Sequence, residues 1–483
     1  MPTFPTDAIA PVLRTGRLTL ITLGAGLAWG GALAQSFPAY TLQPLPLTAF
    51  TALNDKGQIL GSAIPPCSLG QICLMSDAPA LVDTASGTVT IVSPDYGALN
   101  GNSQLAGASI LRDASGAIVR SVLVRRPDGT VSSGSPPAID PTLTYPLRAR
   151  SLTNTGFIAV QLSDGLDAVL TRSCTPYPGW IGSLTGAWTA LGGGTLQVSL
   201  SGSNAAGRVA GAGVPVSLCA TRDFRALVAS PDGSWIDLHG THPGPSSRAY
   251  AINDRDYATG EVNTGTLDAS GRPITHAMVW NTLAGVAFDL SPSSGVTSRL
   301  SGINARGEVV GRTGADATSA RAVIGNHAIS SALFDLNNLL SNNTGGWILT
   351  EALAINTAGQ IVARGYSPGG SGYVLVTPTQ APTDPYATAP AAPTALAAQA
   401  LSSTQVRLSW TNVARNATGL QVERCAGTKC TSFTRIASLP GDVATFLDTT
   451  VSRSTAYRFR VRATNPAGAS AYTAPVGVTT PRR

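Results

Sequence analysis

The hydrophobic and polar positions of residues 40–378 follow a pattern that returns about every 50 residues. It is clearest at residues 53–61 (LNDKGQILG), where an aliphatic residue and an asparagine precede a glycine and a short apolar run. A fixed period of this length is typical of a repeat architecture, so the sequence predicts seven units. The steps between their asparagines are 46, 54, 50, 49, 51 and 52 residues, at Asn54, Asn100, Asn154, Asn204, Asn253, Asn304 and Asn356.

Each asparagine is expected to begin a turn between two strands. An Asn side chain hydrogen-bonds the backbone two residues further on, and the following glycine tolerates a positive φ at the end of the turn. The residues after the turn alternate, as in 308–311 (EVVG), which is typical of a strand. The whole segment therefore predicts a hairpin, and its second strand ends at a glycine where another backbone can approach closely.

Two further strands are predicted in each unit. An apolar or β-branched block follows the turn, for example at residues 276–280 (HAMVW) and 321–324 (RAVI), and has the character of a buried strand. A fourth segment then ends in an Asp-Leu pair, at residues 237–238, 289–290 and 335–336. Four short strands in such a unit are the content of one propeller blade.

The unit resembles the bacterial extracellular HAF repeat, named for a His-Ala-Phe triplet that residues 276–278 (HAM) nearly match. The resemblance implies a secreted, propeller-like β-protein whose activity is generally undefined. We therefore expect residues 35–378 to form a seven-bladed β-propeller, because a closed ring gives every blade two neighbours. The strand at residues 40–43 is expected to complete the last blade. Six or eight blades stay open as alternatives, since the third unit is atypical.

Residues 391–480 predict a second β-domain of a different kind. Period-two alternation at residues 404–410, 420–424 and 457–463 is typical of the strands of a β-sandwich. Residues 379–390, rich in proline and alanine, predict a semi-rigid, extended linker between the two domains. The chain as a whole is thus expected to be all-β, with a propeller followed by a sandwich.

The second domain resembles a fibronectin type III domain. In that resemblance Trp410 matches the core tryptophan, and Tyr457 matches the tyrosine whose hydroxyl ties back to upstream backbone. Leu420 stands where the family usually has tyrosine, which is a mild departure. The resemblance implies an immunoglobulin-like β-sandwich.

Residues 1–34 have the features of a secretion signal. Arg14 and Arg17 form a positive region, residues 18–28 are apolar, and residues 32–34 (ALA) form a small-residue cleavage site. The alternative is an anchored transmembrane helix, but the apolar run is shorter than the ~20 residues that a span needs. We therefore expect a secreted, extracellular protein with no membrane span in the mature chain, and the periplasm is the alternative location.

The cysteines favour an oxidising compartment. Cysteines close together along the chain are expected to pair, the first two with each other and the last two with each other. The middle two would then pair across neighbouring units. This choice rests on proximity, and a zinc site is disfavoured because the sequence has no Cys-x-x-Cys motif. The six cysteines are Cys67, Cys73, Cys174, Cys219, Cys425 and Cys430.

Composition narrows the class of protein. Hydrophobic residues make up 43% of the chain and charged residues 12%, which is typical of an ordered, turn-rich β-protein. The net charge is +6, and all but two of the 32 basic residues, Lys56 and Lys429, are arginine. The arginines are scattered, with no basic run interleaved with aromatic residues, so no nucleic-acid partner is expected.

One local cluster has residue types that could carry chemistry, as a metal site or an acid–base pair. An architectural role is favoured, since Asp237 belongs to the recurring Asp-Leu pair and Asp254 has a counterpart in Asp55 of the first turn. The sequence lacks a nucleophile elbow, a phosphate loop and a zinc helix, so no catalytic, cofactor-binding or metal-ligating residue is predicted. The cluster comprises Asp237, His239, His242, Asp254 and Asp256.

A second candidate is a stripe of basic side chains in the sandwich. Arg458, Arg460 and Arg462 alternate along one predicted strand, so they share a face. They would either contact an anionic polymer or form the solvated face of the sandwich, and the second interpretation is favoured.

Two functions are compatible with these patterns. The first is a secreted, non-catalytic binding or surface-interaction protein, because propeller loops form a broad face and the sandwich can serve as a spacer or adhesion unit. Its partner would be a glycan or a protein of the cell surface, and no cofactor is expected. The alternative is a secreted glycan hydrolase or lyase, which rests on analogy of fold alone.

Overall fold

The computed structural model describes residues 37–483 except 65–76, 93–95, 113–114, 116–117, 136–138, 140–145, 163–178, 192–195, 216–222, 241–243, 292–294 and 317–318. The predicted signal at residues 1–34 lies outside the described residues, and so do Cys67, Cys73, Cys174, Cys219 and His242. Within the described part, no helix has both the length and the apolar character needed to cross a membrane.

Among the described residues, those before position 379 form seven antiparallel, four-stranded sheets, here called sheets 1 to 7. Sheet 1 comprises β2 (Ala49–Leu53), β3 (Gln58–Ala63), β4 (Ala78–Asp83) and β5 (Val89–Ile91). Sheet 2 comprises β6 (Tyr96–Leu99), β7 (Leu105–Arg112), β8 (Ile118–Arg125) and β9 (Val131–Gly134). Sheet 3 comprises β10 (Leu147–Leu152), β11 (Ile158–Leu162), β12 (Gly179–Gly182) and β13 (Thr189–Ala190). Sheet 4 comprises β14 (Leu196–Ser203), β15 (Val209–Pro215), β16 (Arg225–Ala229) and β17 (Trp235–Asp237).

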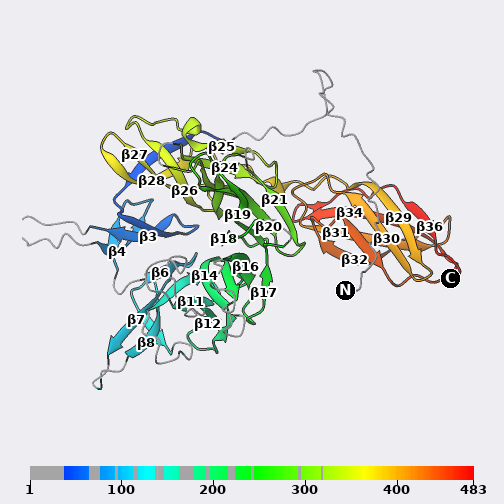
Figure 1. Cartoon of the computed structure of the whole chain (residues 1–483), viewed down its shortest axis with the longest axis horizontal. Coiled ribbons are helices and arrows are strands. Elements are labelled where there is room, and N and C mark those ends of the chain that lie inside the picture. Colours follow the sequence, from blue (N-terminus) through cyan, green and yellow to red (C-terminus); the bar gives the residue numbers. More distant parts are fainter. Residues whose placement is uncertain are drawn as a thin grey trace, which may run out of the picture. The chain divides into compact units, whose positions relative to one another are not determined.

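The remaining sheets follow the same order along the chain (Figure 1). Sheet 5 comprises β18 (Ser247–Ile252), β19 (Tyr257–Leu267), β20 (Pro273–Asn281) and β21 (Val286–Asp289). Sheet 6 comprises β22 (Ser298–Ile303), β23 (Glu308–Thr313), β24 (Arg321–Asn326) and β25 (Leu333–Asp335). The 3-10 helix η3 (Leu336–Leu339) follows β25. Sheet 7 comprises β26 (Ile348–Ile355), β27 (Ile361–Ser367), β28 (Gly370–Pro378) and β1 (Tyr40–Leu45).

The first strand of the chain completes the last sheet of the repeats. β1 pairs with β28 in antiparallel register, from Tyr40 opposite Pro378 to Leu45 opposite Tyr373 (Figure 1). The sequence predicts this pairing, and the register confirms it. Because the two strands are more than 300 residues apart in sequence, their hydrogen bonds tie the two ends of the repeats together.

Each sheet packs its apolar side chains on the next, and sheet 7 packs on sheet 1. Ile59 and Ala80 of sheet 1 share a core cluster with Val362 and Leu375 of sheet 7. The other clusters join neighbouring sheets in chain order. Burying one aliphatic side chain contributes about 1.5–3 kcal/mol, so every interface between sheets is a source of stability.

Glycine is required where the first two strands of a sheet approach each other. A Cβ on Gly61 would lie 2.2 Å from the carbonyl oxygen of Ala49, and one on Gly311 would lie 2.0 Å from that of Arg299. In both sheets the register between the strands shifts beside the glycine. The close approach that the sequence predicts at these glycines is confirmed.

The recurring Asp-Leu pair ends the fourth strand of three sheets. The Asp289 carboxylate accepts a hydrogen bond from the backbone N–H of Ser291 at 2.8 Å, and Asp237 and Asp335 make the equivalent bond two residues on. The leucine that follows is buried, with Leu290 0% exposed. The aspartate therefore caps a turn, and the leucine anchors that turn in the core.

Residues after the linker form a β-sandwich of two sheets around one core. One sheet comprises β29 (Thr394–Ser402), β30 (Gln405–Thr411) and β33 (Thr445–Asp448). The other comprises β32 (Thr434–Pro440), β31 (Gly419–Ala426), β34 (Ala456–Asn465) and β35 (Gly468–Ala469), with β36 (Val476–Thr479) also paired to β34. Cys425 and Cys430 form the predicted disulfide.

Trp410 and Tyr457 both lie in the core of the sandwich. The Trp410 indole donates to the carbonyl of Val443 at 3.0 Å. The Tyr457 hydroxyl accepts from the backbone N–H of Ser452 at 2.8 Å, which is the tie to upstream backbone that the resemblance implies. These bonds satisfy the polar ends of two large buried rings.

The linker contacts both neighbours, and it is not the open, extended spacer that its composition predicts. It contains the 3-10 helix η4 (Pro385–Ala387), whose Tyr386 is 2% exposed. The Arg255 guanidinium lies 4.1 Å from the centre of the Tyr386 ring, an arrangement that favours a cation–π interaction. The aromatic side chain thus supplies packing that proline and alanine alone would not.

A half-buried carboxylate joins the sandwich to sheet 5. Asp442 accepts hydrogen bonds from the Tyr257 hydroxyl and from the Asn281 amide, each at 2.7 Å. Burial raises the pKa of Asp442, while the two hydrogen bonds oppose that shift.

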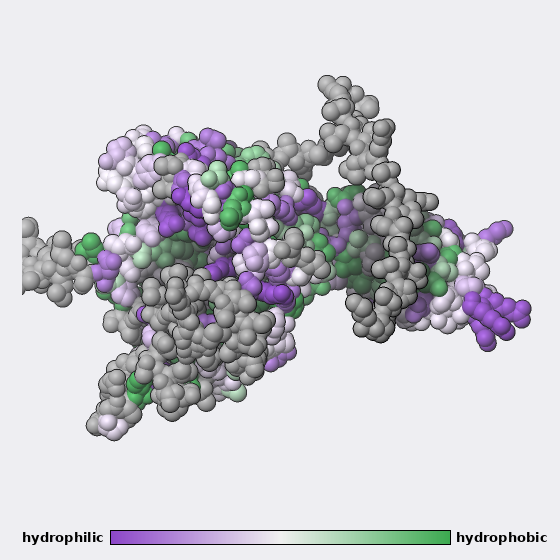
Figure 2. Space-filling model, in the orientation of Figure 1, coloured by the Kyte–Doolittle hydropathy of each residue, from purple (hydrophilic) through white to green (hydrophobic). Residues whose placement is uncertain are grey.

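On the face shown in Figure 2, apolar and polar residues are interspersed. Leu267 and Leu283 are exposed apolar side chains, and single ones of this kind are common on protein surfaces.

Candidate functional site

Six of the seven turn asparagines, all but Asn154, are buried and bonded within their own turns. Asn54, which is 5% exposed, accepts at Oδ1 from the backbone N–H groups of Lys56 (3.0 Å) and Gln58 (2.9 Å). The bond to the residue two positions on is the predicted one. Gly57 ends the turn with a φ of 75°, a value that glycine adopts without steric cost.

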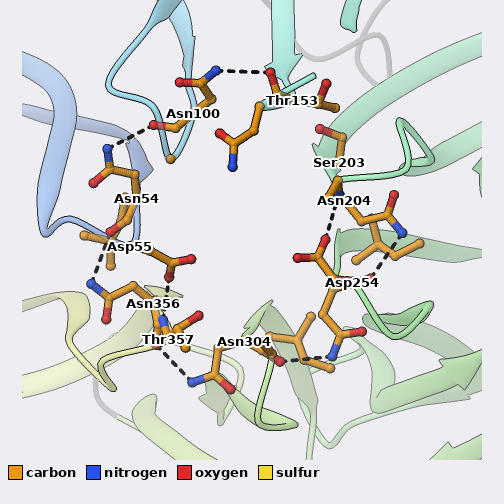
Figure 3. Close-up of a pocket in the computed structure, with 18 of the residues that line it drawn as sticks. Asn54, Asp55, Asn100, Thr153, Ser203, Asn204, Asp254, Asn304, Asn356 and Thr357 are labelled. Atoms are coloured by element: carbon orange, nitrogen blue, oxygen red, sulfur yellow. Dashed lines mark hydrogen bonds between the residues drawn. The ribbon is translucent and has the colours of Figure 1, made fainter. Parts of the chain in front are cut away.

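The same side chains link each sheet to its neighbour. In each link an asparagine Nδ2 donates to a backbone carbonyl in the turn of the following sheet (Figure 3). The last link returns from sheet 7 to sheet 1, so the bonds form a cycle with one gap, between sheets 3 and 4. The pairs are Asn54–Asn100 (3.0 Å), Asn100–Thr153 (3.1 Å), Asn204–Asn253 (3.2 Å), Asn253–Asn304 (2.9 Å), Asn304–Asn356 (2.9 Å) and Asn356–Asn54 (3.1 Å).

The gap arises because Thr153, and not Asn154, occupies the asparagine position in sheet 3. The Thr153 hydroxyl accepts from the N–H of Phe157 at 2.9 Å, as Asn54 does from Gln58. A threonine has no amide to donate onward. Asn154 lies one position later and accepts from the N–H of Asn102 at 3.1 Å. The sequence pattern placed this turn one residue too late because it followed the asparagine.

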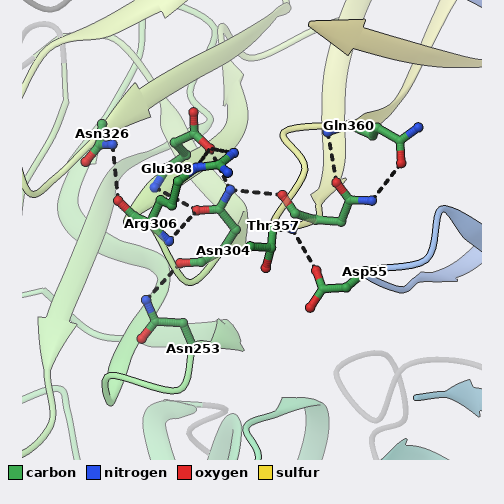
Figure 4. Close-up of polar contacts among 9 residues, drawn as sticks. Asp55, Asn253, Asn304, Arg306, Glu308, Asn326, Thr357 and Gln360 are labelled. Atoms are coloured by element: carbon green, nitrogen blue, oxygen red, sulfur yellow. Dashed lines mark hydrogen bonds and ion pairs between the residues drawn. The ribbon is translucent and has the colours of Figure 1, made fainter. Parts of the chain in front are cut away.

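The turn of sheet 6 has the most extensive bonding (Figure 4). Glu308 is 2% exposed, accepts from the Asn304 amide at 2.6 Å and pairs with Arg306 at 2.9 Å. Asn326 donates to the carbonyl of Arg306 at 3.2 Å. The Glu308 carboxylate therefore stabilises the turn.

The seven turns surround a polar pocket of about 230 Å³, here called the turn pocket. Asp55 and Asp254 point into it from opposite sides (Figure 3). Each uses one oxygen to accept a backbone N–H of a neighbouring turn at 2.7 Å, from Thr357 and Ala205 respectively. The exposed polar atoms of this pocket thus also brace the turns.

Behind the turns lies a larger space of about 610 Å³, here called the first-strand cavity because the first strand of every sheet lines it. One residue from each sheet lines both spaces, and six of these seven side chains are leucine or isoleucine. The seven residues are Leu53, Leu99, Leu152, Ser203, Ile252, Ile303 and Ile355. This narrow apolar band separates the polar turn pocket from the cavity behind it.

The wall of the first-strand cavity carries Arg150, Arg248 and Tyr250. The Tyr250 hydroxyl donates to Glu261 at 2.7 Å, and the Arg299 guanidinium lies 5.8 Å from the centre of the Tyr250 ring. Burial and the neighbouring Glu261 raise the pKa of Tyr250, so it stays a neutral donor. No acidic residue lines this cavity in the described part of the chain.

A buried ion-pair network extends from this wall. Glu351 is 1% exposed and pairs with Arg299 and, at 2.7 Å, with Arg364. Burial disfavours the charge of Arg299, but the nearby Glu351, Tyr250 and Glu261 together raise the pKa of that guanidinium. Burial lowers the pKa of Arg312, and the positive charge of Arg299 lowers it further.

The acidic and histidine cluster singled out in the sequence is divided among separate structural roles. Asp237 pairs with Arg225 at 3.1 Å, and His239 lies 2.9 Å from the Ser247 hydroxyl. Asp256 pairs with Arg208 at 2.7 Å. Among the described residues, no group of three or more His, Cys, Asp or Glu side chains is placed to hold a metal ion.

The arginine stripe of the sandwich is occupied by contacts within the domain. Arg460 pairs with Glu423 at 2.6 Å, and its guanidinium lies 3.8 Å from the centre of the Tyr472 ring. Arg462 donates to Gln421 at 2.8 Å, and Arg458 donates to the carbonyl of Cys430 at 2.9 Å. These contacts favour the interpretation of the stripe as a structural face of the sandwich.

Sequence reasoning missed the arginines of the first-strand cavity. The available signal was a charged residue inside a predicted first strand, as at Arg150 and Arg248. The sequence showed these arginines as scattered because their neighbours in space are about 50 residues apart along the chain.

No family model matches the sequence, and no curated protein matches it. Among solved structures, a Fn3-like protein from Clostridium thermocellum is 28% identical, covers 20% of this chain and 98% of that chain, and has a TM-score of 0.18. The FN5 domain of Drosophila Lar is 22% identical, covers 19% of this chain and 97% of that chain, and has a TM-score of 0.17. These are structures to which about a fifth of the chain is similar.

Proposed function

We propose that sheets 1 to 7 are the blades of a closed β-propeller and that the protein is a secreted, non-catalytic binding protein. Three features support closure: the pairing of β1 with β28, the core cluster shared by sheets 7 and 1, and the amide link from Asn356 to Asn54. Radial closure leaves only short edges exposed. The Cys425–Cys430 disulfide supports secretion, because such bonds persist in oxidising compartments.

The observation that carries the binding function is the first-strand cavity. Its volume of about 610 Å³ lies within the range of small-molecule sites, roughly 300–1,000 Å³. Its lining combines aliphatic side chains with polar ones, namely Arg150, Arg248, Tyr250, Thr51 and several serines. Polar groups that can fix the orientation of a ligand in a concave site are typical of binding sites. A glycan is the partner class that we propose, and the sandwich acts as a docked spacer or adhesion unit.

A substitution that fills the cavity tests this function. A Cβ on Gly202 would lie 3.5 Å from the Cα of Ala251, an ordinary contact, and Gly202 lines the cavity, so a leucine there is expected to narrow it. Glycan-array binding by the full chain should be lost in Gly202→Leu. A side chain added in the turn at Gly87, where nothing lies within 4 Å, gives the control Gly87→Asn, because asparagine tolerates the φ of +70° found there. Undiminished binding by correctly folded Gly202→Leu would exclude the cavity as the site.

The alternative, a glycan hydrolase or lyase, is favoured by one observation. Asp55 and Asp254 face the same pocket, and paired carboxylates are the usual catalytic groups of glycosidases. Each is also bonded to a neighbouring turn. A polysaccharide-degrading activity that Asp254→Asn abolishes would support the enzyme, and unchanged activity in that variant would exclude this pair.

A further inference from the structure

We propose that the first-strand cavity binds a glycoside, with its sugar against sheets 3 to 6 and an apolar aglycone against sheets 7, 1 and 2. This inference deepens the proposed function, on which it rests, by naming the class of glycan. Two observations carry it: a β-bulge residue of every sheet lines the cavity, and the polar side chains of the wall are gathered on one side.

The first strand of every sheet has a β-bulge three residues before the turn residue. In sheet 5 the register passes from Ala249 to Ala251 on the first strand while it moves by one residue on the second strand, so Tyr250 is the extra residue. The register shifts across the same position in the other six sheets. A bulge re-aims the side chain of its extra residue, and bulges are frequent beside functional sites.

All seven residues at this position line the first-strand cavity, and they are here called the bulge ring. Because the bulge recurs whichever residue it holds, these side chains can differ without a change in strand pairing. The bulge ring is therefore the part of the wall that determines which ligand the cavity accepts. Sheets 3 to 6 supply Arg150, Ser201, Tyr250 and Ser301, and sheets 7, 1 and 2 supply Leu353, Thr51 and Gly97.

The rest of the wall follows the same division. Sheets 3 to 5 add the polar side chains of Ser151, Ser199 and Arg248. Among the described residues that sheets 7, 1 and 2 contribute, Thr51 has the only polar side chain, and the others are Gly, Ala, Leu, Ile and Phe. These three sheets are neighbours, since sheet 7 packs on sheet 1. The cavity therefore has a polar side and an apolar side.

A ligand that fills such a cavity needs two sides of its own. Sugar hydroxyls against the polar side can exchange hydrogen bonds with the serine hydroxyls, which both donate and accept. A hydroxyl against Leu353 or Ala354 would lose its bonds to water and gain none from those side chains, which is unfavourable. An alkyl or aryl group in the same place is stabilised by its removal from water. A glycoside with an apolar aglycone therefore matches both sides, and a free sugar matches one.

Isothermal titration calorimetry of the full chain tests the two sides separately. The probes are the hexyl and methyl β-glycosides of glucose, galactose and N-acetylglucosamine, and 1-hexanol. For at least one sugar, the hexyl form should bind roughly ten- to a hundredfold more tightly than the methyl form, because the longer chain buries more methylene groups. It should also bind about tenfold more tightly than hexanol, which has no sugar for the polar side.

Two results would overturn the proposal. One is that no hexyl glycoside binds, or that the hexyl and methyl forms of every sugar bind equally. The other is that hexanol binds as tightly as the hexyl glycosides, which would exclude the sugar and leave a purely apolar site.

Substitutions then place the ligand on the two sides. Leu353→Asn should weaken binding of the hexyl glycoside about tenfold and leave the methyl form unchanged, because an amide would face the aglycone. Ser201→Ala should weaken both forms by roughly two- to tenfold, because it removes a hydroxyl from the polar side. The matched control is Leu283→Asn, at a leucine that is 57% exposed and outside the cavity, and it should change neither.

The failure of this proposal is distinguishable from failure of the proposed function. If Gly202→Leu abolishes binding while Leu353→Asn weakens both forms equally, the cavity binds a sugar without a site for an aglycone, and only this proposal is wrong. If Gly202→Leu leaves binding of the hexyl glycoside unchanged, the ligand binds outside the cavity and both proposals are wrong. Thermal unfolding shows whether each variant keeps its fold, and Leu353→Ala, which adds no polar group, replaces Leu353→Asn if that variant does not.

Discussion

The turn pocket and the first-strand cavity are formed by the same seven sheets, yet their residues are used differently. Around the turn pocket, six sheets place an asparagine at one position, and each is 5% exposed or less. Around the first-strand cavity, the position three residues before the turn residue differs from sheet to sheet, from Thr51 in sheet 1 to Arg150 in sheet 3 and Tyr250 in sheet 5. Positions that hold the same residue in almost every sheet stabilise the scaffold, whereas positions that differ from sheet to sheet are the candidates for binding a ligand.

Sheet 5 illustrates the same rule at the turn itself. Four residues after the asparagine, Gln58, Gln104 and Gln360 accept a hydrogen bond from their own asparagine side chain. In sheet 5 this position is Tyr257, and its hydroxyl donates instead to Asp442 of the sandwich. The departure from the repeat marks the place where another domain is held.

The largest effect is expected from the buried carboxylate behind the cavity. Glu351→Gln should lower the free energy of unfolding by roughly 3 kcal/mol, because Arg299 and Arg364 would lose the charge that they share. Chemical denaturation measures this loss. The control is Asp316→Asn, which breaks an exposed pair with Arg272 and should cost less than about 1 kcal/mol. Equal losses in both variants would show that the network near the cavity is not a buried one.

The next largest effect tests whether the turn asparagines stabilise the scaffold. Asn304→Ala should lower the unfolding free energy by about 2 kcal/mol, because it removes bonds to Arg306, Glu308 and the carbonyl of Asn356, all at a buried position. Binding of any ligand in the first-strand cavity should be unchanged. A variant that keeps its stability but loses binding would reverse the roles assigned to the two spaces.

A pH dependence is expected where sheet 5 holds the sandwich. Since burial raises the pKa of Asp442 above its ordinary value of 3.8, its stabilising contribution is fully present below that value. The contribution is lost as the pH rises through the raised pKa, with at most about 1.4 kcal/mol per pKa unit. The unfolding free energy, measured against pH, should show this loss in the wild type and not in Asp442→Asn. Parallel curves for the two proteins would contradict the raised pKa.

Local features of this fold were predictable from sequence, and contacts between distant segments were not. The capping by Asn54, the close approach at Gly61 and the disulfide at Cys425 each depend on a few neighbouring residues. The pairing of β1 with β28 followed from the need to complete a repeat. In contrast, the bond between Tyr257 and Asp442 joins residues 185 positions apart, and no local pattern encodes it.

The smallest expected effect is a gain of stability at the gap in the cycle of amide links. Thr153→Asn would supply an amide that can donate to the turn of sheet 4, as Asn100 donates to Thr153 at 3.1 Å. The side chain is 5% exposed, like the asparagines, so a new bond there would be shielded from water. The expected gain is about 1 kcal/mol in the unfolding free energy, measured by chemical denaturation. Thr155→Asn, at the exposed neighbouring turn position, is the control and should give no gain. A loss of stability in Thr153→Asn would mean that the turn of sheet 3 requires threonine, and that this break in the repeat has a structural reason of its own.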